Sequence, residues 1–253
     1  MKLRGLGVYA AVVLAFLHLP LLILIAFSFN ASRFTIWEGF SLRWYQAAMQ
    51  DTQLSDGLVN SVIIAVVASV ISTIVGTLAA YGIWRRSAPM LSGSLYLSLV
   101  TPEIVTGVSL LALFQWAFHF LHLRLGLATV IIAHVAFSIA YVAIVISARL
   151  RNFDRSLEEA AMDLGASEWR AFTRVTLPSL VPAIAAAGLL ALVVSFDDYV
   201  ITSLVTGVDS QTLPMVIYAM ARRGVSPVIN AVSALILVAF GAIILLSQRL
   251  ERA

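Results

Sequence analysis

Long apolar segments alternate with short polar ones along the whole chain. Each apolar segment is about 20 residues or longer, the length that an α-helix needs to cross a hydrocarbon core about 30 Å thick. Pro20 interrupts the first one and no small-residue cleavage site follows it, so we expect a retained anchor rather than a cleaved signal. The pattern predicts an all-α membrane protein in which one transmembrane domain, residues 1–253, holds six spans: 9–27, 58–84, 91–118, 125–148, 180–204 and 225–247.

The composition excludes several other classes of protein. Only 11% of the residues are charged, whereas a soluble domain carries about 25%. A net charge of +3 on so apolar a chain gives no reason to expect a nucleic-acid partner, and membrane lipid is expected instead. Cysteine is absent, and we expect no metal site and no catalytic residue. Lys2 is the only lysine, so a phosphate-binding loop of the type G-x-x-x-x-G-K-[ST] cannot form, and the chain is not expected to be an enzyme.

The distribution of basic residues predicts the orientation in the membrane. Arginine and lysine favour cytoplasmic loops, and an even number of spans places both termini on one side. Eleven basic residues lie on that side: Lys2, Arg4, Arg85, Arg86, Arg149, Arg151, Arg155, Arg170, Arg174, Arg249 and Arg252. Five lie on the other side: Arg33, Arg43, Arg124, Arg222 and Arg223. Both termini are therefore expected to lie in the cytoplasm. The outer loop 28–57, which is rich in aromatic residues, is expected to lie along the outer surface.

Residues 149–178 form a cytoplasmic segment with balanced charges. Ser156 and Glu159 have the spacing of a capping box, in which each side chain satisfies a free backbone N–H at a helix start. Gly165 is expected to end this helix after about two turns, because glycine adopts a left-handed conformation without steric cost. Ser167 is expected to cap a second short helix. Leu177 and Pro178 are expected to end that helix.

Two helices this short need a surface to pack on. That surface is either the rest of this protein or a partner, and we expect the segment from Leu157 to Phe172 to bind a partner rather than the rest of this protein. The apolar residues concerned are Ala160, Met162, Leu164, Trp169 and Phe172.

This segment resembles the EAA motif of ABC importer permeases, E-A-A-x3-G-x9-I-x-L-P, with Val175 in place of Ile. The resemblance implies a type I ABC importer permease fold and a coupling helix that docks on a cytoplasmic ATPase. It places this chain in a bacterial cytoplasmic membrane, together with a second permease. It also implies two copies of that ATPase, which bind ATP and Mg outside this chain, and an extracytoplasmic substrate-binding protein. The coupling role is carried over to Glu159, Ala160, Ala161, Asp163, Leu164 and Gly165.

Further stretches resemble, more narrowly, the second permease subunit of putrescine/spermidine importers. The resemblance implies a polyamine substrate, although related permeases for other substrates share much of the same scaffold. The matching stretches are Phe27–Asn30, Ser32–Phe34, Ile146–Leu150, Asp154–Ser156, Ser195–Val200, Leu213–Pro214 and Gly224–Pro227.

Three carboxylates lie within predicted spans, where a charge is costly unless it faces a partner or a water-filled path. They are candidates for stabilising a cationic substrate, and neighbouring aromatic rings can add cation–π contacts of about 0.5–2 kcal/mol. Pro102 is expected to bend the third span beside the first of them. The candidate path residues are Glu103, Asp197, Asp198, Tyr199, Phe196 and Trp116.

A structural role for the same residues stays open. Adjacent aspartates project about 100° apart on a helix, so one of Asp197 and Asp198 is expected to cap or pair rather than face a path. Alternatively both mark an extracellular helix break and pair with Arg222 or Arg223. Two histidines, His18 and His134, are expected to be interhelical hydrogen-bonding groups, and His119 and His122 are expected to lie at an outer helix end. Close packing between helices is expected at the small residues Ser69, Thr73, Gly76 and Ala80.

Two other classes of function compete with an importer permease. An ion-coupled carrier would use the carboxylates as proton relays, but such carriers commonly carry an inverted repeat, and none is evident here. An intramembrane enzyme would need a catalytic motif, and neither H-E-x-x-H nor G-x-S-x-G occurs.

Overall fold

A computed structural model describes the chain except for residues 1, 35, 122–123, 225 and 251–253. Its regular elements are helices, with an isolated antiparallel bridge between Asn30 and Phe40. The chain divides into two compact units, residues 1–55 with 216–253 and residues 56–215.

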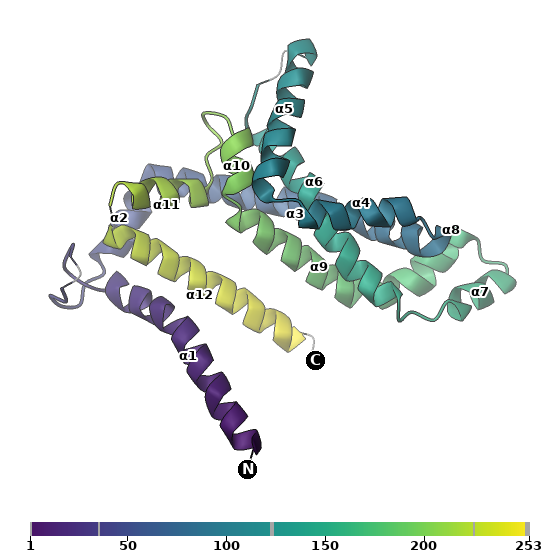
Figure 1. Cartoon of the computed structure of the whole chain (residues 1–253), viewed down its shortest axis with the longest axis horizontal. Coiled ribbons are helices and arrows are strands. Elements are labelled where there is room, and N and C mark those ends of the chain that lie inside the picture. The colour runs from purple at the N-terminus through teal and green to yellow at the C-terminus, as the bar shows by residue number, and fades with distance from the viewer. Residues whose placement is uncertain (1, 35, 122–123, 225, 251–253) are drawn as a thin grey trace. The chain divides into compact units, whose positions relative to one another are not determined.

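The first unit holds α1 (Lys2–Ser28), α2 (Arg43–Gln50) and α12 (Pro227–Leu250), and α1 lies beside α12 (Figure 1). Asn30 organises the loop after α1: its amide donates to the carbonyl of Ile36 at 2.8 Å, and its side-chain oxygen accepts from the N–H of Glu38 at 3.0 Å. The Trp44 indole N–H donates to the Asn30 carbonyl at 2.7 Å. The loop that sequence reasoning treated only as an interfacial aromatic segment therefore has a fixed internal structure.

The second unit contains the remaining elements. They are α3 (Thr52–Arg86, whose first residues belong to the other unit), α4 (Pro89–Val100), α5 (Glu103–Leu121), α6 (Leu127–Leu150), α7 (Ser156–Asp163), α8 (Glu168–Ala171), the π-helical turn η1 (Phe172–Thr176), α9 (Leu177–Asp197) and α10 (Val200–Val205). α11 (Leu213–Arg222) lies where the chain passes from this unit to the other.

Four helices of the described chain are long and apolar enough to cross a membrane: Leu6–Ser28, Thr52–Arg86, Leu127–Leu150 and Glu168–Asp197. A fifth is added if α4 and α5 form one broken span, and the described part of the last helix, Pro227–Ala242, is a shorter apolar helix. The all-helical prediction is confirmed, and the count of six spans stays a prediction.

Two predicted spans are not continuous helices, and each break lies where the sequence suggested one, at Pro102 and at Asp197–Asp198. The third, 91–118, is broken at 101–102, where α4 and α5 meet at 110°. Pro102 has no N–H to donate, so the helical ladder is interrupted at this point, and its carbonyl instead accepts the N–H groups of Val105 and Thr106. The fifth, 180–204, ends at Asp197 and resumes as α10 at Val200.

The predicted end of a helix at Leu177 and Pro178 was wrong. The chain runs from α8 through η1 into α9 as one helical stretch of 30 residues, Glu168–Asp197. In η1 the N–H of Leu177 donates to the Phe172 carbonyl, five residues back. This wider turn places Pro178 in the first turn of α9, where a missing N–H costs no hydrogen bond.

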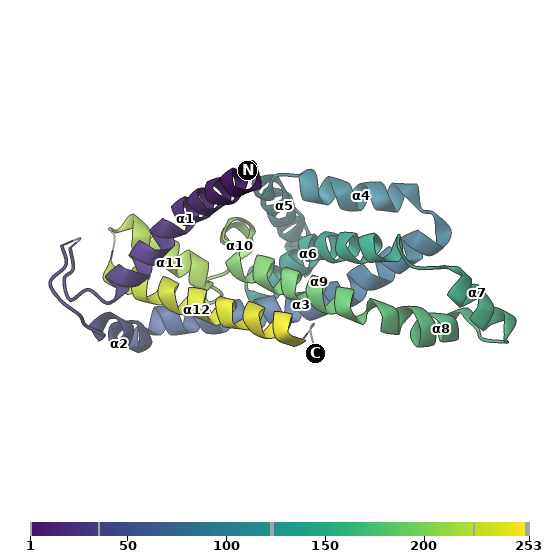
Figure 2. The same ribbon diagram turned by 90° about the horizontal axis from the view of Figure 1, so that it is seen from below.

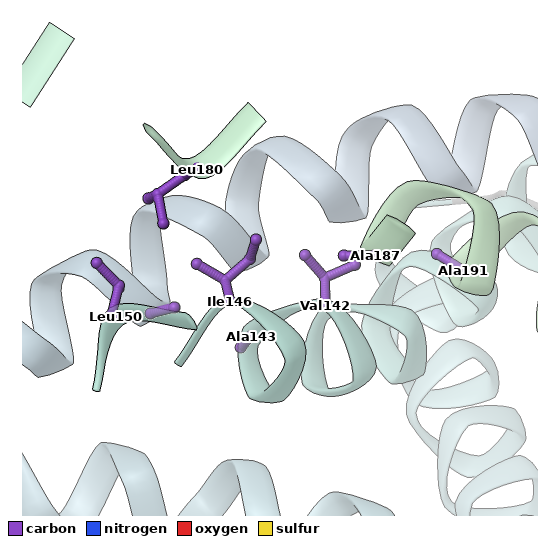
Figure 3. Packing of buried hydrophobic residues seen from close by; sticks show 8 residues of the cluster. Val142, Ala143, Ile146, Leu150, Leu180, Ala187 and Ala191 are labelled. Atoms are coloured by element: carbon purple, nitrogen blue, oxygen red, sulfur yellow. The ribbon is translucent and has the colours of Figure 1, made fainter. Parts of the chain in front are cut away.

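The core of the second unit lies between α6 and α9, which run side by side (Figures 1 and 2). Figure 3 shows side chains of α6 facing those of α9 across this interface. The fully buried members are Ala80, Val142, Ala143, Ile146, Leu150, Leu180, Ala187 and Ala191.

Small residues bring these helices close together, as predicted. The Ser69 hydroxyl of α3 donates to the Gly188 carbonyl of α9 at 2.7 Å. A Cβ atom on Gly76 would lie 2.8 Å from the Cβ of Val142 and 3.0 Å from the carbonyl oxygen of Ile139, so α3 and α6 touch at a position where only glycine fits.

Candidate functional site

A cavity of about 530 Å³ lies where the two helix breaks of the second unit meet. α4, α5, α6, α9 and α10 all contribute to its walls. Thr101 and Pro102 come from the first break and Tyr199 from the second, so segments about 100 residues apart share one space. Its lining comprises Ser98, Leu99, Val100, Thr101, Pro102, Glu103, Thr106, Phe137, Tyr141, Val193, Val194, Asp197, Asp198, Tyr199, Val200 and Ile201.

Four of the six candidate path residues line this cavity: Glu103, Asp197, Asp198 and Tyr199. Glu103 is exposed in the first turn of α5, and Asp197 is exposed at the last residue of α9. Phe196 and Trp116 are not among the lining residues, and Trp116 is 66% exposed on α5. The helix breaks, which hydropathy alone did not place, bring the carboxylates together.

Asp198 has a different environment from Asp197. Its carboxylate accepts the N–H of Thr202 at 2.8 Å, the Thr202 hydroxyl at 2.8 Å and the N–H of Ile201 at 3.3 Å. It therefore caps the N-terminus of α10. The side chain is only 5% exposed, and Nε2 of His134 lies 3.4 Å from it. The expectation that one aspartate of the pair caps or pairs is confirmed, and the residue is Asp198.

His134 of α6 joins three helices at this point. Its Nδ1 lies 2.7 Å from the Ser195 hydroxyl of α9, and its Nε2 lies 2.9 Å from the Thr202 hydroxyl of α10. The prediction of an interhelical hydrogen-bonding histidine is confirmed here. For His18 it was wrong: Nδ1 bonds the Leu14 carbonyl one turn back in the same helix. His122 lies outside the described residues.

The coupling segment begins differently from the predicted capping box. α7 starts at Ser156, but the cap is Asp154, whose carboxylate accepts the Ser156 N–H at 3.0 Å. This backbone hydrogen bond, together with one from the Ser156 side chain, lowers the pKa of the Asp154 carboxyl. Glu159 is instead paired with Arg155, at 3.8 Å, because the two residues lie one turn apart on an exposed face.

Glycine ends α7 as expected. Gly165 has φ +88°, and the N–H of Ala166 donates to the Ala161 carbonyl at 3.0 Å, which closes the helix end. The Ser167 hydroxyl then accepts the Arg170 N–H at 3.4 Å, so the second predicted cap is confirmed.

The two faces of this segment differ. Its outer face is exposed, with Leu164 at 91% and Trp169 at 67%. Of the residues carried over from the EAA motif, Glu159, Ala160, Asp163, Leu164 and Gly165 are exposed and Ala161 is half-buried.

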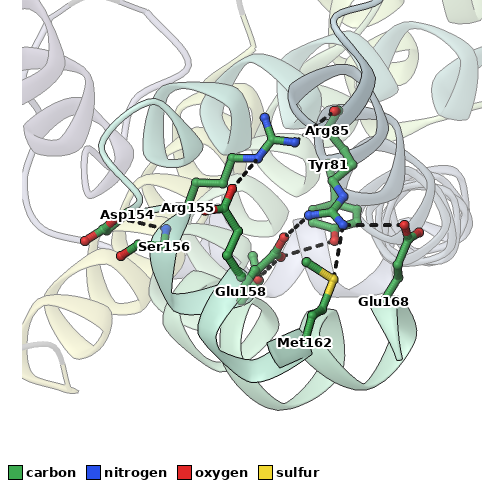
Figure 4. A network of polar contacts seen from close by, with 10 residues as sticks. Tyr81, Arg85, Asp154, Arg155, Ser156, Glu158, Met162 and Glu168 are labelled. Carbon is green, nitrogen blue, oxygen red and sulfur yellow. Dashed lines mark hydrogen bonds and ion pairs between the residues drawn. The ribbon is translucent and has the colours of Figure 1, made fainter. Parts of the chain in front are cut away.

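The inner face packs on this chain through a buried glutamate (Figure 4). The expectation that this segment binds a partner rather than the rest of the protein was therefore wrong for this face. Glu158 is 0% exposed, and Arg85 of α3 donates to it at 2.8 Å. The Tyr81 hydroxyl, also on α3, donates to it at 3.1 Å, and the Thr176 hydroxyl of η1 donates to the same carboxylate. Sequence reasoning missed Glu158 and treated Arg85 only as a topology signal. Met162, one turn on from Glu158, marks the same inward face and was the available signal.

Residues 72–252 match the family described as "Binding-protein-dependent transport system inner membrane component". The chain belongs to this family. The permease protein PotI of the putrescine transport system of Escherichia coli (strain K12) is 43% identical over 235 residues, which cover 90% of this chain and 84% of PotI. The permease protein PotC of the spermidine/putrescine transport system of the same strain is 37% identical over 250 residues, covering 97% of this chain and 93% of PotC.

The fold also has a close counterpart among solved structures. A chain in the crystal structure of a bacterial ABC transporter involved in the import of alginate matches with a TM-score of 0.73 at 17% identity, covering 97% of this chain and 96% of that one. The predicted type I ABC importer permease fold and the predicted importer-permease family are thereby confirmed for this inner membrane component.

Proposed function

We propose that this chain is a permease subunit of an ATP-driven importer of polyamines such as putrescine and spermidine. The observation that carries the proposal is the cavity in which Glu103, Asp197 and Asp198 meet at two helix breaks. A carboxylate in a partly desolvated site attracts a cation more strongly than in bulk water, because the effective dielectric constant is lower. Polyamines carry ammonium groups at both ends, and PotI and PotC, the relatives named above, belong to putrescine and spermidine transport systems.

The lining residues have distinct roles in this proposal. Glu103 and Asp197 are exposed to the cavity and bind ammonium groups. Asp198 contributes negative charge while it caps α10. Tyr199 offers a ring face for a cation–π contact of about 0.5–2 kcal/mol. Phe196 and Trp116, which do not line the cavity, are not assigned a substrate contact.

The remaining subunits complete the importer. The exposed face of α7 and α8 docks on one copy of a cytoplasmic ABC ATPase, of which two copies bind ATP and Mg. A second permease completes the path, and an extracytoplasmic binding protein delivers the substrate. The outer surface of α1, where Tyr9 is 70% and Phe16 75% exposed, faces lipid or the second permease. Both termini lie in the cytoplasm, as the arginine distribution predicts.

Uptake by the reconstituted complex tests this proposal. The chain, assembled with its second permease, ATPase and binding protein, is expected to take up radiolabelled putrescine or spermidine only when ATP is supplied. The double variant Glu103→Gln with Asp197→Asn is expected to reduce uptake at least about tenfold, equivalent to about 1.4 kcal/mol. Asp56→Asn removes an exposed carboxylate of α3 outside the cavity and serves as the control.

Three results would overturn it. Uptake driven by a proton gradient without ATP would favour an ion-coupled carrier. Unchanged uptake in the double variant would remove the cationic-substrate argument, and uptake of an uncharged or anionic solute in preference to polyamines would point to another importer substrate.

A further inference from the structure

The buried Glu158 has no place in substrate binding and faces away from the exposed surface that the proposed function assigns to the ATPase. A carboxylate that is 0% exposed is costly unless it is paired and fully hydrogen-bonded. Here Arg85, Tyr81 and Thr176 all donate to it, from two other elements. A single side chain of α7 therefore holds α3 and η1 together.

Further contacts surround this network on the same face. Nη2 of Arg85 lies 3.5 Å from the Met162 sulfur, one turn along α7. The rings of Tyr81 and Phe172 lie 4.4 Å apart between centroids, and the guanidinium of Arg155 lies 5.5 Å from the ring centroid of Trp84. α7 cannot shift against α3 without breaking several of these contacts together, so the two helices form one rigid piece at this end.

The other end of α3 is fixed to the segment 206–213, directly after α10. The amide of Asn60 donates to the carbonyl of Gln211 at 2.9 Å, and the Ser61 hydroxyl accepts the N–H of Leu213 at 2.9 Å. Arg85 and Asn60 are 25 residues apart in one helix, a distance of roughly 38 Å at 1.5 Å per residue. α10 itself contributes Val200 and Ile201 to the cavity.

We propose that the Glu158–Arg85 pair fastens α7 to α3, and that α3 carries movement of α7 to the segment 206–213 and thus to α10 at the cavity. This inference rests on the proposed function, because it supplies the ATPase that moves α7. This path through α3 is a second route by which movement of α7 reaches the cavity. The first route is direct, because η1 continues into α9. Glu158, Arg85 and Asn60 are positioning residues in the route through α3 and contact neither substrate nor ATPase.

The number of substrate molecules taken up per ATP hydrolysed tests the route in the assembled importer. Glu158→Gln keeps the shape of the side chain, but it removes the ion pair and replaces one acceptor oxygen with an NH2 donor. We expect this ratio to fall about threefold or more, as for substitutions along coupling networks, while co-purification with the ATPase stays at the wild-type level. Asp56→Asn is the control, because it removes an exposed carboxylate of the same helix α3, outside both the cavity and the face assigned to the ATPase.

Two further variants separate a mechanical link from local stability. Asn60→Ala alters the far end of α3, removes no buried charge, and is expected to lower the same ratio. Glu158→Cys with Arg85→Cys, in a chain that has no other cysteine, is expected to lose coupling and to regain it when a short bis-maleimide joins the two thiols. Restored coupling after cross-linking cannot come from restored charge.

The outcomes distinguish this inference from the proposed function. If wild-type uptake of polyamines is absent, the proposed function fails, and ATPase stimulation by the loaded binding protein still reports coupling. If Glu158→Gln or Asn60→Ala keeps the wild-type ratio, α9 alone carries the movement and the inference is overturned. A cross-linked cysteine pair that stays uncoupled overturns it as well.

Discussion

Substitution of the two adjacent aspartates of the cavity is expected to affect different properties, substrate uptake for Asp197 and protein stability for Asp198. Asp197 is exposed and Asp198 is a 5% exposed helix cap bonded to Thr202 and Ile201. Asp197→Asn is therefore expected to reduce uptake about tenfold and to leave the free energy of unfolding within about 0.5 kcal/mol of the wild type, as for other exposed positions. Asp198→Ala is expected to destabilise the protein.

The size of the second effect follows from the contacts of Asp198. Loss of a helix cap costs about 0.5–2 kcal/mol. The Thr202 hydroxyl also loses a charged acceptor in a fully buried position, and hydrogen bonds to charged groups contribute about 1.5–3 kcal/mol. Together the loss is about 2–5 kcal/mol. Asp198→Asn keeps an oxygen for the cap, so its effect is expected to be intermediate.

Thermal unfolding and uptake on the same purified complexes measure both quantities. The wild type and Asp197→Asn are expected to unfold at the highest temperature, Asp198→Asn at a lower one and Asp198→Ala at the lowest. The reasoning is refuted if Asp198→Ala unfolds at the wild-type temperature, or if Asp197→Asn is destabilised to the same extent as Asp198→Ala.

Three further predictions concern packing, coupling and orientation. Gly76→Ala places a Cβ 2.8 Å from Val142 and is expected to cost about 1–3 kcal/mol in unfolding free energy. Gly82→Ala is the matched control, because nothing lies within 4 Å of its Cβ and alanine gains up to about 1 kcal/mol of helix propensity. Equal unfolding temperatures of the two variants would contradict this. Gly165→Pro is expected to abolish co-purification with the ATPase, since proline cannot adopt φ +88°, and wild-type yield of the complex would argue against the docking role. Ser167→Cys is expected to react with an impermeant maleimide only after the membrane is opened, and labelling of intact cells would reverse the predicted orientation.

The sequence predicts the helices better than their ends. Apolar segments long enough to span a membrane are evident from composition alone, and α6 lies within two residues of its predicted bounds at each end. Hydropathy could not show that two predicted spans are broken, because the pieces on both sides of a break are equally apolar. Pro102 indicated a bend, but the angle of 110° depends on how α5 packs against α10.

Adjacent charged residues show the limit of a sequence pattern most clearly. Glu158 and Glu159 are chemically identical neighbours, yet one is 0% exposed and the other is exposed. The EAA spacing singles out Glu159, while the buried partner is selected by Arg85, which lies 73 residues earlier in the chain. The same holds for the cavity aspartates, since His134 of α6 reaches only one of them. Which of two neighbours faces inward is decided by tertiary contacts, and the i, i+4 spacing of Glu158 and Met162 indicates the inward face without identifying the partner.

The helix breaks and the cavity depend on each other. A break leaves backbone N–H and C=O groups without helical partners, and such groups are tolerated at membrane depth only where protein or a water-filled space satisfies them. Pro102 and Tyr199 mark the two breaks and line the same cavity, so both breaks border one space. Glu103 and Asp197 line the same cavity, and a charge within a membrane span is costly unless it faces a partner or a water-filled space. In the proposed function, the same geometry supplies a place where a cation can leave bulk water while keeping polar partners.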